Sequence, residues 1–227
     1  MKAVAFIPIK LNNERLPGKN IKRFYDGTPL IQFIMSSLTQ IAELDEIYVF
    51  CSDESINEYL TDNVRFLKRP EFLDGPEATP QDIIREFMNL VDSDIYMVSH
   101  VTSPFVSVSH LNECLTAVSS GAYGSAFTGE RIKKLLWNVN REALNFDPGN
   151  IPRTQELPPV YAEVSAAYAF TKETFFKYNR RTGPSPYIVE LSGVECIDID
   201  YPEDFIIADA IYKQMPGLNS GIHGLKG

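Results

Sequence analysis

Short apolar runs alternate with longer amphipathic segments along the first half of the chain. Residues 3–9 form a nearly continuous apolar run that ends at a polar loop, which is typical of a strand buried on both faces of a parallel sheet. Further strands are predicted at 46–51, 64–68 and 94–99, and helices at 30–41, 54–61, 79–92 and 107–119. This alternation predicts a doubly wound, mostly parallel sheet that binds its ligands beyond the carboxyl ends of the strands.

The pattern changes from Tyr123 onward. Strand-like pieces at 125–128, 136–140 and 165–170 are separated by proline-rich turns, so we expect residues 125–170 to form an inserted arm, used as a flap or for dimerisation. The chain then returns to the sheet, with a predicted core strand at 193–199 and a closing helix at 202–213. Residues 214–227 are rich in glycine and polar side chains and are expected to form a flexible tail on a single domain that spans 1–227.

Composition and charge argue against several classes of function. The chain has 227 residues and a net charge of -9, which does not suit a nucleic-acid or anionic-membrane partner because phosphates are held mainly by clustered Lys and Arg. No apolar run approaches the roughly 20 residues that cross a bilayer. The cysteines, Cys51, Cys114 and Cys196, are too few and odd in number for a disulfide framework, so we expect a cytoplasmic protein.

The loop after the first strand, residues 10–20 with the sequence KLNNERLPGKN, concentrates positive charge. It holds three cations, Lys10, Arg15 and Lys19, and the turn-forming pair Pro17-Gly18. Backbone amides and cations so placed suit a triphosphate. The alternative is a solvated turn with ordinary surface cations.

Carboxylates follow two of the predicted strands. Asp198 and Asp200 alternate on the strand predicted at 193–199, so both would face one side, where hard carboxylate oxygens suit Mg²⁺ held jointly with substrate phosphates. Asp53 follows the strand at 46–51. The alternatives are a cap or turn for the aspartate pair and a helix N-cap for Asp53.

The ordered motifs of this chain resemble those of acylneuraminate cytidylyltransferases, also called CMP-sialic acid synthetases. The motifs are residues 10–20, Cys51-Ser52-Asp53, Arg69-Pro70, Thr102-Ser103-Pro104 and Asp198-Ile199-Asp200. The resemblance implies a three-layer α/β/α Rossmann-like nucleotidyltransferase fold, with a mostly parallel mixed sheet and a small β-rich dimerisation arm. It also implies CTP as co-substrate, Mg²⁺ as cofactor, and transfer of CMP to the anomeric hydroxyl of a 2-keto-3-deoxy sugar acid with release of pyrophosphate.

The resemblance also implies roles for individual residues. The catalytic residues would be Lys10, Lys19 and Asp200, and the metal ligands Asp198 and Asp200. The residues that bind CTP would be Lys10, Asn12, Arg15, Lys19, Asn20, Asp53, Arg69 and Thr79. The residues that bind the sugar acid would be His100, Thr102, Ser103, Arg153, Gln155 and Glu163, with Arg153 on the carboxylate. Members of the family are commonly homodimers, which allows Arg153 to reach a site in the other subunit.

The chain departs from the family pattern at five positions. Lys10 stands where the family usually has arginine, Glu14 for lysine, His100 for glutamine, Val101 for proline and Val106 for arginine. A histidine at a strand end can donate to a hydroxyl or carboxylate, act as a base near neutral pH, or be structural. The departures leave two alternatives to sialic acid activation: transfer to another acidic acceptor, or a catalytically silent nucleotide-binding paralogue.

Overall fold

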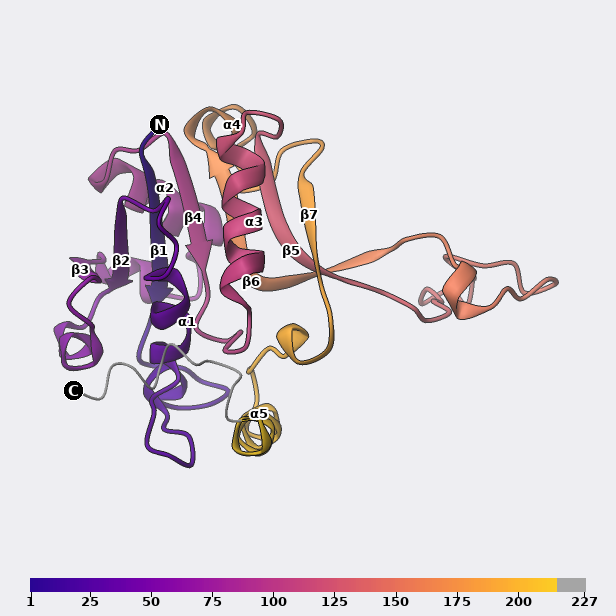
Figure 1. Cartoon of the computed structure of the whole chain (residues 1–227), viewed down its shortest axis with the longest axis horizontal. Coiled ribbons are helices and arrows are strands. Elements are labelled where there is room, and N and C mark those ends of the chain that lie inside the picture. Colours follow the sequence, from indigo (N-terminus) through magenta and orange to yellow (C-terminus); the bar gives the residue numbers. More distant parts are fainter. Residues whose placement is uncertain (216–227) are drawn as a thin grey trace.

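The computed structural model describes residues 1–215 and contains one seven-stranded mixed sheet (Figure 1). The strands are β1 (Ala3–Ile9), β2 (Glu46–Cys51), β3 (Arg65–Lys68), β4 (Ile95–Ser99), β5 (Ser125–Arg131), β6 (Tyr161–Thr171) and β7 (Tyr187–Leu191). Their order across the sheet is β3-β2-β1-β4-β6-β5-β7. β1 is parallel to β2 and β4, whereas β6 is antiparallel to both β4 and β5, so the carboxyl ends of β1 to β4 lie at the same edge as the start of β6.

Helices cover both faces of the sheet. The α-helices are α1 (Ile31–Leu38), α2 (Pro80–Leu90), α3 (Val108–Ser119), α4 (Lys172–Tyr178) and α5 (Pro202–Gln214). The 3-10 helices are η1 (Lys19–Ile21), η2 (Glu54–Tyr59), η3 (Glu71–Asp74), η4 (Thr154–Glu156) and η5 (Gly193–Cys196). Side chains of β1 alternate between two cores: Ala5 and Ile7 pack with α1, α3 and α5, whereas Val4 and Phe6 pack with α2 and α4. The predicted three-layer α/β/α fold is therefore confirmed.

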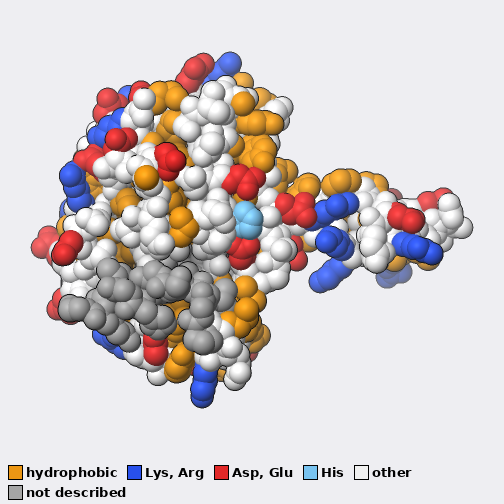
Figure 2. Space-filling view, in the orientation of Figure 1, with side chains coloured by type: hydrophobic (Ala, Val, Ile, Leu, Met, Phe, Trp, Pro, Cys, Tyr) orange, Lys and Arg blue, Asp and Glu red, His pale blue; other side chains and the backbone are white. Residues whose placement is uncertain are grey.

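An arm leaves the sheet between β5 and β6 and extends away from the body of the molecule (Figure 1). The part outside the sheet is residues 132–160, closed at its base by a hydrogen bond from Ile132 N to Val160 O of 2.8 Å. Basic side chains gather at this base (Figure 2), where Lys134 is exposed. The strand predicted at 136–140 is wrong. Its only ladder contact in the described chain is an isolated bridge between Trp137 and Ala143, and between these two residues Arg141 turns the chain with a φ of 67°.

The C-terminal part differs most from expectation. The core strand predicted at 193–199 is wrong, because Gly193 adopts a φ of 61° and starts η5, which ends the strand direction. The edge strand is instead β7, and neither β7 nor α4 was predicted. α5 runs on to Gln214, and the rest of the expected tail, 216–227, lies outside the described residues. Among the described residues no helix is long and apolar enough to span a membrane.

Candidate active site

Loops at the carboxyl ends of the strands enclose two adjoining recesses. The first, of about 300 Å³, is lined by residues that include Lys10, Lys19, Asn20, Arg69, His100 and Thr102. The second, of about 360 Å³, shares Lys10 and Lys19 with the first and adds Glu14, Arg15 and Asp200. We call the two together the cleft. A further cavity of about 450 Å³ lies beside α4 and contains none of the predicted site residues.

The loop at 10–20 is shaped by its own hydrogen bonds. Gly18 adopts a φ of 67°, which starts η1 and directs Lys19 into the cleft. The Asn20 amide donates to the carbonyl of Lys10 at 2.8 Å, which joins the two ends of the loop, and Leu16 is buried in the core. Asn20 is itself buried, so its side chain holds the loop in shape as well as lining the cleft.

Two of the three loop cations converge on Asp200. The Lys19 ammonium donates to the Ile199 carbonyl at 2.9 Å and to Asp200 Oδ1 at 3.0 Å, and Arg15 Nη1 donates to Asp200 Oδ2 at 2.9 Å. The Lys19 side chain is 11% exposed, whereas that of Arg15 is 61% exposed. Lys10 lines the same recess. The structure therefore brings the predicted cations together with one carboxylate, an arrangement suited to phosphate oxygens.

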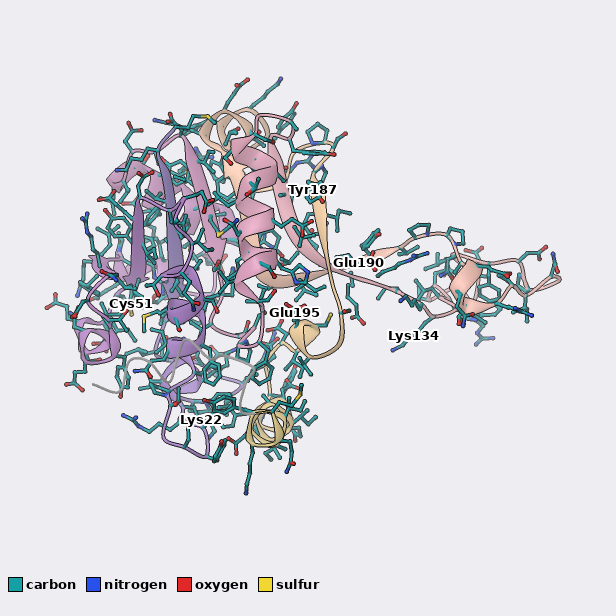
Figure 3. The ribbon with its side chains drawn as sticks, viewed as in Figure 1. Lys22, Cys51, Lys134, Tyr187, Glu190 and Glu195 are labelled. Atoms are coloured by element: carbon teal, nitrogen blue, oxygen red, sulfur yellow. The ribbon has the colours of Figure 1, made fainter. Side chains whose placement is uncertain are left out.

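Hydrogen bonds to neighbouring loops fix the position of Asp200. Ile199 N donates to the carbonyl of Thr102 at 2.9 Å, which places Asp200 beside the loop that follows β4. Upstream, Glu195 in η5 accepts from Ser107 N at 2.8 Å and contacts His110 Nδ1 at 2.9 Å at the start of α3 (Figure 3). These contacts join the segment that carries Asp200 to the sheet without making it a strand.

The predicted metal pair is placed differently from expectation. Residues 197–200 are not in a strand, so the two-residue alternation that was to align Asp198 with Asp200 does not apply. Asp198 is exposed, and within residues 1–215 no three His, Cys, Asp or Glu side chains assemble as a ligand set. Because Mg²⁺ commonly takes one or two carboxylates plus substrate phosphates, Asp200 at the edge of a cationic recess fits that ion. A role for Asp198 stays a prediction.

Two residues predicted to bind the nucleotide serve as helix caps. Asp53 Oδ1 accepts from Ser55 N at 2.9 Å at the start of η2, and this hydrogen bond lowers the pKa of Asp53. Thr79 forms a capping box with Asp82 at the start of α2. Asn12 is exposed and lines a separate acidic recess next to Asp53. A contact of any of them with the nucleotide stays a prediction.

Arg69 is a buried arginine at the wall of the cleft. Arg69 is 2% exposed, and its backbone N donates to the carbonyl of Cys51 at 2.9 Å. Its Nη2 contacts Asp74, which also accepts a hydrogen bond from Ser52. The Nε atom is buried and has no hydrogen-bond partner within the described chain. A buried donor without a partner next to a recess suits an incoming acceptor atom, which agrees with the predicted nucleotide contact.

His100 lies in the cleft as a neutral side chain. Burial, and then the charges of Arg181 and Lys19, lower its pKa to about 4. The Nε2 atom is buried and forms no hydrogen bond within residues 1–215. Of the roles predicted for His100, a base near neutral pH does not fit this pKa, whereas a hydrogen-bonding or structural role does. Ser103 Oγ is buried and likewise has no partner in the described chain.

The remaining acceptor residues fall into two groups. Arg153 and Gln155 are exposed on the arm and line neither recess of the cleft (Figure 1). Glu163 belongs to β6, where its Oε2 accepts from the Tyr168 hydroxyl at 2.9 Å and from Arg181 Nη2 at 3.4 Å. The structure therefore does not gather the predicted acceptor residues within one chain.

Sequence reasoning missed Arg181. Its guanidinium carbon lies 3.4 Å from the centroid of the Tyr168 ring, so the two groups are stacked. Arg181 sits in the connection between α4 and β7, which carries no recognisable motif, so nothing in the sequence indicated it.

Two of the departures from the family pattern, Val101 and Val106, are buried core residues.

A family model matches most of the chain. The model, described as Cytidylyltransferase, covers residues 4–184. The chain belongs to the cytidylyltransferase family. The matched range includes the loop at 10–20, Arg69, His100 and Arg181, and it ends before Asp200.

Relatives of this chain include enzymes named for two kinds of sugar acid. It is 25% identical over 215 residues to the N-acylneuraminate cytidylyltransferase of Oncorhynchus mykiss, a match that covers 90% of this chain and 49% of the relative. It is 24% identical over 215 residues to the 3-deoxy-manno-octulosonate cytidylyltransferase 2 of Hydrogenovibrio crunogenus, covering 86% and 84%. The chain thus spans about half the length of the first relative.

Solved structures confirm the fold. A CMP:2-keto-3-deoxy-manno-octonic acid synthetase complexed with CTP superposes with a TM-score of 0.68 at 21% identity, covering 94% of this chain and 99% of the other. A 4-diphosphocytidyl-2C-methyl-D-erythritol synthase from Anaerococcus prevotii gives a TM-score of 0.65 at 16% identity, covering 93% and 96%. The chain therefore has the Rossmann-like nucleotidyltransferase fold that its motifs implied.

Proposed function

We propose that the protein transfers CMP from CTP to the anomeric hydroxyl of a 2-keto-3-deoxy sugar acid and releases pyrophosphate. The observation that carries this proposal is the convergence of Arg15 and Lys19 on Asp200, in a recess that Lys10 also lines, at one end of a cleft that also contains His100. Family membership and the names of the relatives support the same reaction. Pyrophosphate release with a panel of acids identifies which sugar acid the protein uses.

The chemistry needs charge neutralisation and alignment, not a protein nucleophile. The acceptor hydroxyl attacks the α-phosphorus of CTP, a new P–O bond forms, the bond to the pyrophosphate oxygen breaks, and the hydroxyl proton passes to solvent as pyrophosphate leaves. Lys10 and Lys19 are placed to neutralise the negative charge that grows on the phosphate oxygens, with Arg15 at the exposed rim. Bound Mg²⁺, held by Asp200 and by Asp198, would polarise the α-phosphate.

On the acceptor side, we propose that Thr102 and neutral His100 bind sugar hydroxyls inside the cleft, with Ser103 behind them. Arg153 and Gln155 reach an acceptor only if the arm lies against another subunit, since both are exposed on the arm of their own chain. Exposed apolar side chains give the arm a surface for such contact, and the largest exposures are at Val139 (96%), Leu144 (61%), Ile151 (61%) and Trp137 (54%). We therefore propose a homodimer.

The test is pyrophosphate release from CTP in the presence of Mg²⁺ and a panel of nonulosonic and octulosonic acids. Asp200→Asn is expected to lower turnover about 100-fold or more, because it removes the carboxylate at the centre of the cationic cluster. Asp62→Asn, at an exposed turn outside the cleft, serves as the matched control and is expected to keep the wild-type rate.

Three outcomes count against the proposal in different ways. If pyrophosphate is released with another nucleoside triphosphate but not with CTP, the assignment of CTP as the nucleotide is wrong. If turnover occurs only with acids outside the panel's two classes, the assignment of a 2-keto-3-deoxy sugar acid as the acceptor is wrong. Binding of CTP with no turnover on any acid would indicate a silent nucleotide-binding paralogue.

A further inference from the structure

We infer that Arg181 binds the carboxylate of the acceptor acid from within the same chain. This inference rests on the proposed function, since it assigns to the acceptor acid a residue that lies next to the cleft, beyond the residues that line its two recesses. It gives the carboxylate a partner other than Arg153, which lies on the arm.

Arg181 is held in a fixed position. Its guanidinium carbon is 3.4 Å from the ring centroid of Tyr168, a fully buried residue of β6. Its side chain is only 22% exposed, and its Nη2 donates to Glu163 Oε2 at 3.4 Å. Stacking on an aromatic face fixes the plane of the guanidinium and reduces the entropy lost when it binds a ligand.

The stacked guanidinium lies near His100, because Tyr168 contacts both residues. Tyr168 pairs with Val98 of β4, two residues before His100, and the Tyr168 and His100 rings have centroids 6.3 Å apart. Tyr168 and Val98 pack in the core that contains α2, and α2 also supplies Pro80 and Ile83 to the wall of the cleft. Burial first, and then the charges of Arg181 and Lys19, lower the pKa of His100, so both cations act on this ring.

The two cationic groups that act on His100 suit two different anions. Lys19 and Arg15 contact Asp200 at the end of the cleft assigned to the triphosphate. Arg181 has five N–H donors, and the contact with Glu163 uses one of its nitrogens at a long distance. A carboxylate is the planar anion that a guanidinium binds with two parallel hydrogen bonds. A CTP phosphate at Lys19 and an acid group at Arg181 would bracket His100 and the reacting hydroxyl.

The experiment measures KM for N-acetylneuraminic acid, 3-deoxy-octulosonic acid and the methyl ester of whichever acid turns over, at saturating CTP. In Arg181→Ala, KM for the acid is expected to rise about 10- to 100-fold, the range for a lost hydrogen bond to a charged group. The KM for CTP stays near the wild-type value, and the preference for the acid over its methyl ester collapses. Arg181→Lys keeps the charge but not the planar guanidinium, so its KM for the acid is expected to lie between that of the wild-type protein and that of Arg181→Ala.

Two comparisons make the result specific. Arg180→Ala removes the neighbouring arginine, which is exposed and stacks on Tyr178, and it is expected to behave like wild type. Arg153→Ala tests the other candidate for the carboxylate. Thermal melting and the KM for CTP show whether each variant is folded. If Arg181→Ala does not fold, Arg181→Lys tests the inference in its place.

The outcomes separate the inference from the proposed function. If the wild-type protein is active and the folded Arg181 variants keep the wild-type KM and ester discrimination, the inference is overturned while the proposed function stands. The same holds if only Arg153→Ala loses the discrimination. If the wild-type protein releases no pyrophosphate with any acid, the proposed function fails and the inference fails with it.

Discussion

His100 gives a prediction whose magnitude follows from the structure. The imidazole lies at the end of β4, its Nε2 is buried, and burial together with Arg181 and Lys19 lowers its pKa from 6.5 to about 4. The folded protein therefore holds a neutral imidazole down to about pH 4, whereas the unfolded chain begins to bind a proton below about pH 6.5. Replacing His100 with Gln keeps a polar side chain and removes this titration.

Whether this stability rises or falls with pH depends on whether the folded or the unfolded state binds the proton first. A lowered folded-state pKa means that the unfolded state takes up the proton first as the pH falls. The stability tied to neutral His100 is therefore complete above about pH 6.5 and is lost progressively between about pH 6.5 and about pH 4. The gap between the two pKa values, at 1.36 kcal/mol per pH unit, corresponds to about 3 kcal/mol.

The assay is urea unfolding of the wild-type protein and His100→Gln between about pH 7.5 and about pH 4. Both proteins lose stability from their other groups, and the wild-type protein is expected to lose about 3 kcal/mol more than the variant. Parallel curves would refute the reasoning and place the His100 pKa near its ordinary value. The pH profile of turnover supplies a second reading: the variant should show the same profile near neutral pH as the wild-type protein, because His100 does not titrate there.

Two further predictions concern the loop and the arm. Gly18→Ala is expected to cost about 1 kcal/mol of unfolding free energy, since an added Cβ meets no atom within 4 Å and only the φ of 67° is strained. Gly27→Ala, at a φ of 88° with equally open space, should cost a similar amount in the same urea titration, yet only Gly18→Ala should raise the KM for CTP, and equal KM values would contradict the role given to this turn. Val139→Asp, at the most exposed apolar side chain of the arm, should convert a dimer to a monomer in light scattering with an unchanged melting temperature. A wild-type monomer in the same measurement would contradict the proposed dimer.

Periodicity was enough to predict the first half of the fold. Each strand from β1 to β4 lies within a few residues of its predicted run. The buried strands β1 and β4 are largely apolar, and the helices that follow them keep a helical spacing. The second half lacks these signals. α4 has seven residues, too short for a clear period, and β7 is a five-residue edge strand that ends at Leu191, two residues before the left-handed Gly193. The apolar run at 193–199 looks like a strand, but a left-handed glycine and the hydrogen bond from Ile199 to Thr102 use it as a connection instead.

The candidate site was predictable where sheet geometry alone brings residues together. The loop after β1 and His100 after β4 meet because neighbouring parallel strands end at the same edge. Asp53 illustrates the limit of that reasoning, since the same position at a strand end also serves as an N-cap, and the structure shows the cap. Arg181 reaches Tyr168 from an irregular connection, and neither periodicity nor a motif can place such a side chain.

The ion pairs of Asp200 lead to opposite predictions for CTP binding and for turnover. This carboxylate pairs with both Arg15 and Lys19, so a triphosphate that enters the cleft competes with Asp200 for the same donors. Asp200→Asn removes the competing charge and leaves both cations available. Without Mg²⁺ the variant should therefore bind CTP at least as tightly as the wild-type protein in calorimetry, although its turnover falls. If Asp200→Asn instead weakens metal-free CTP binding while the protein stays folded, the carboxylate acts mainly to hold Lys19 in position, and its role in catalysis is one of positioning the cation.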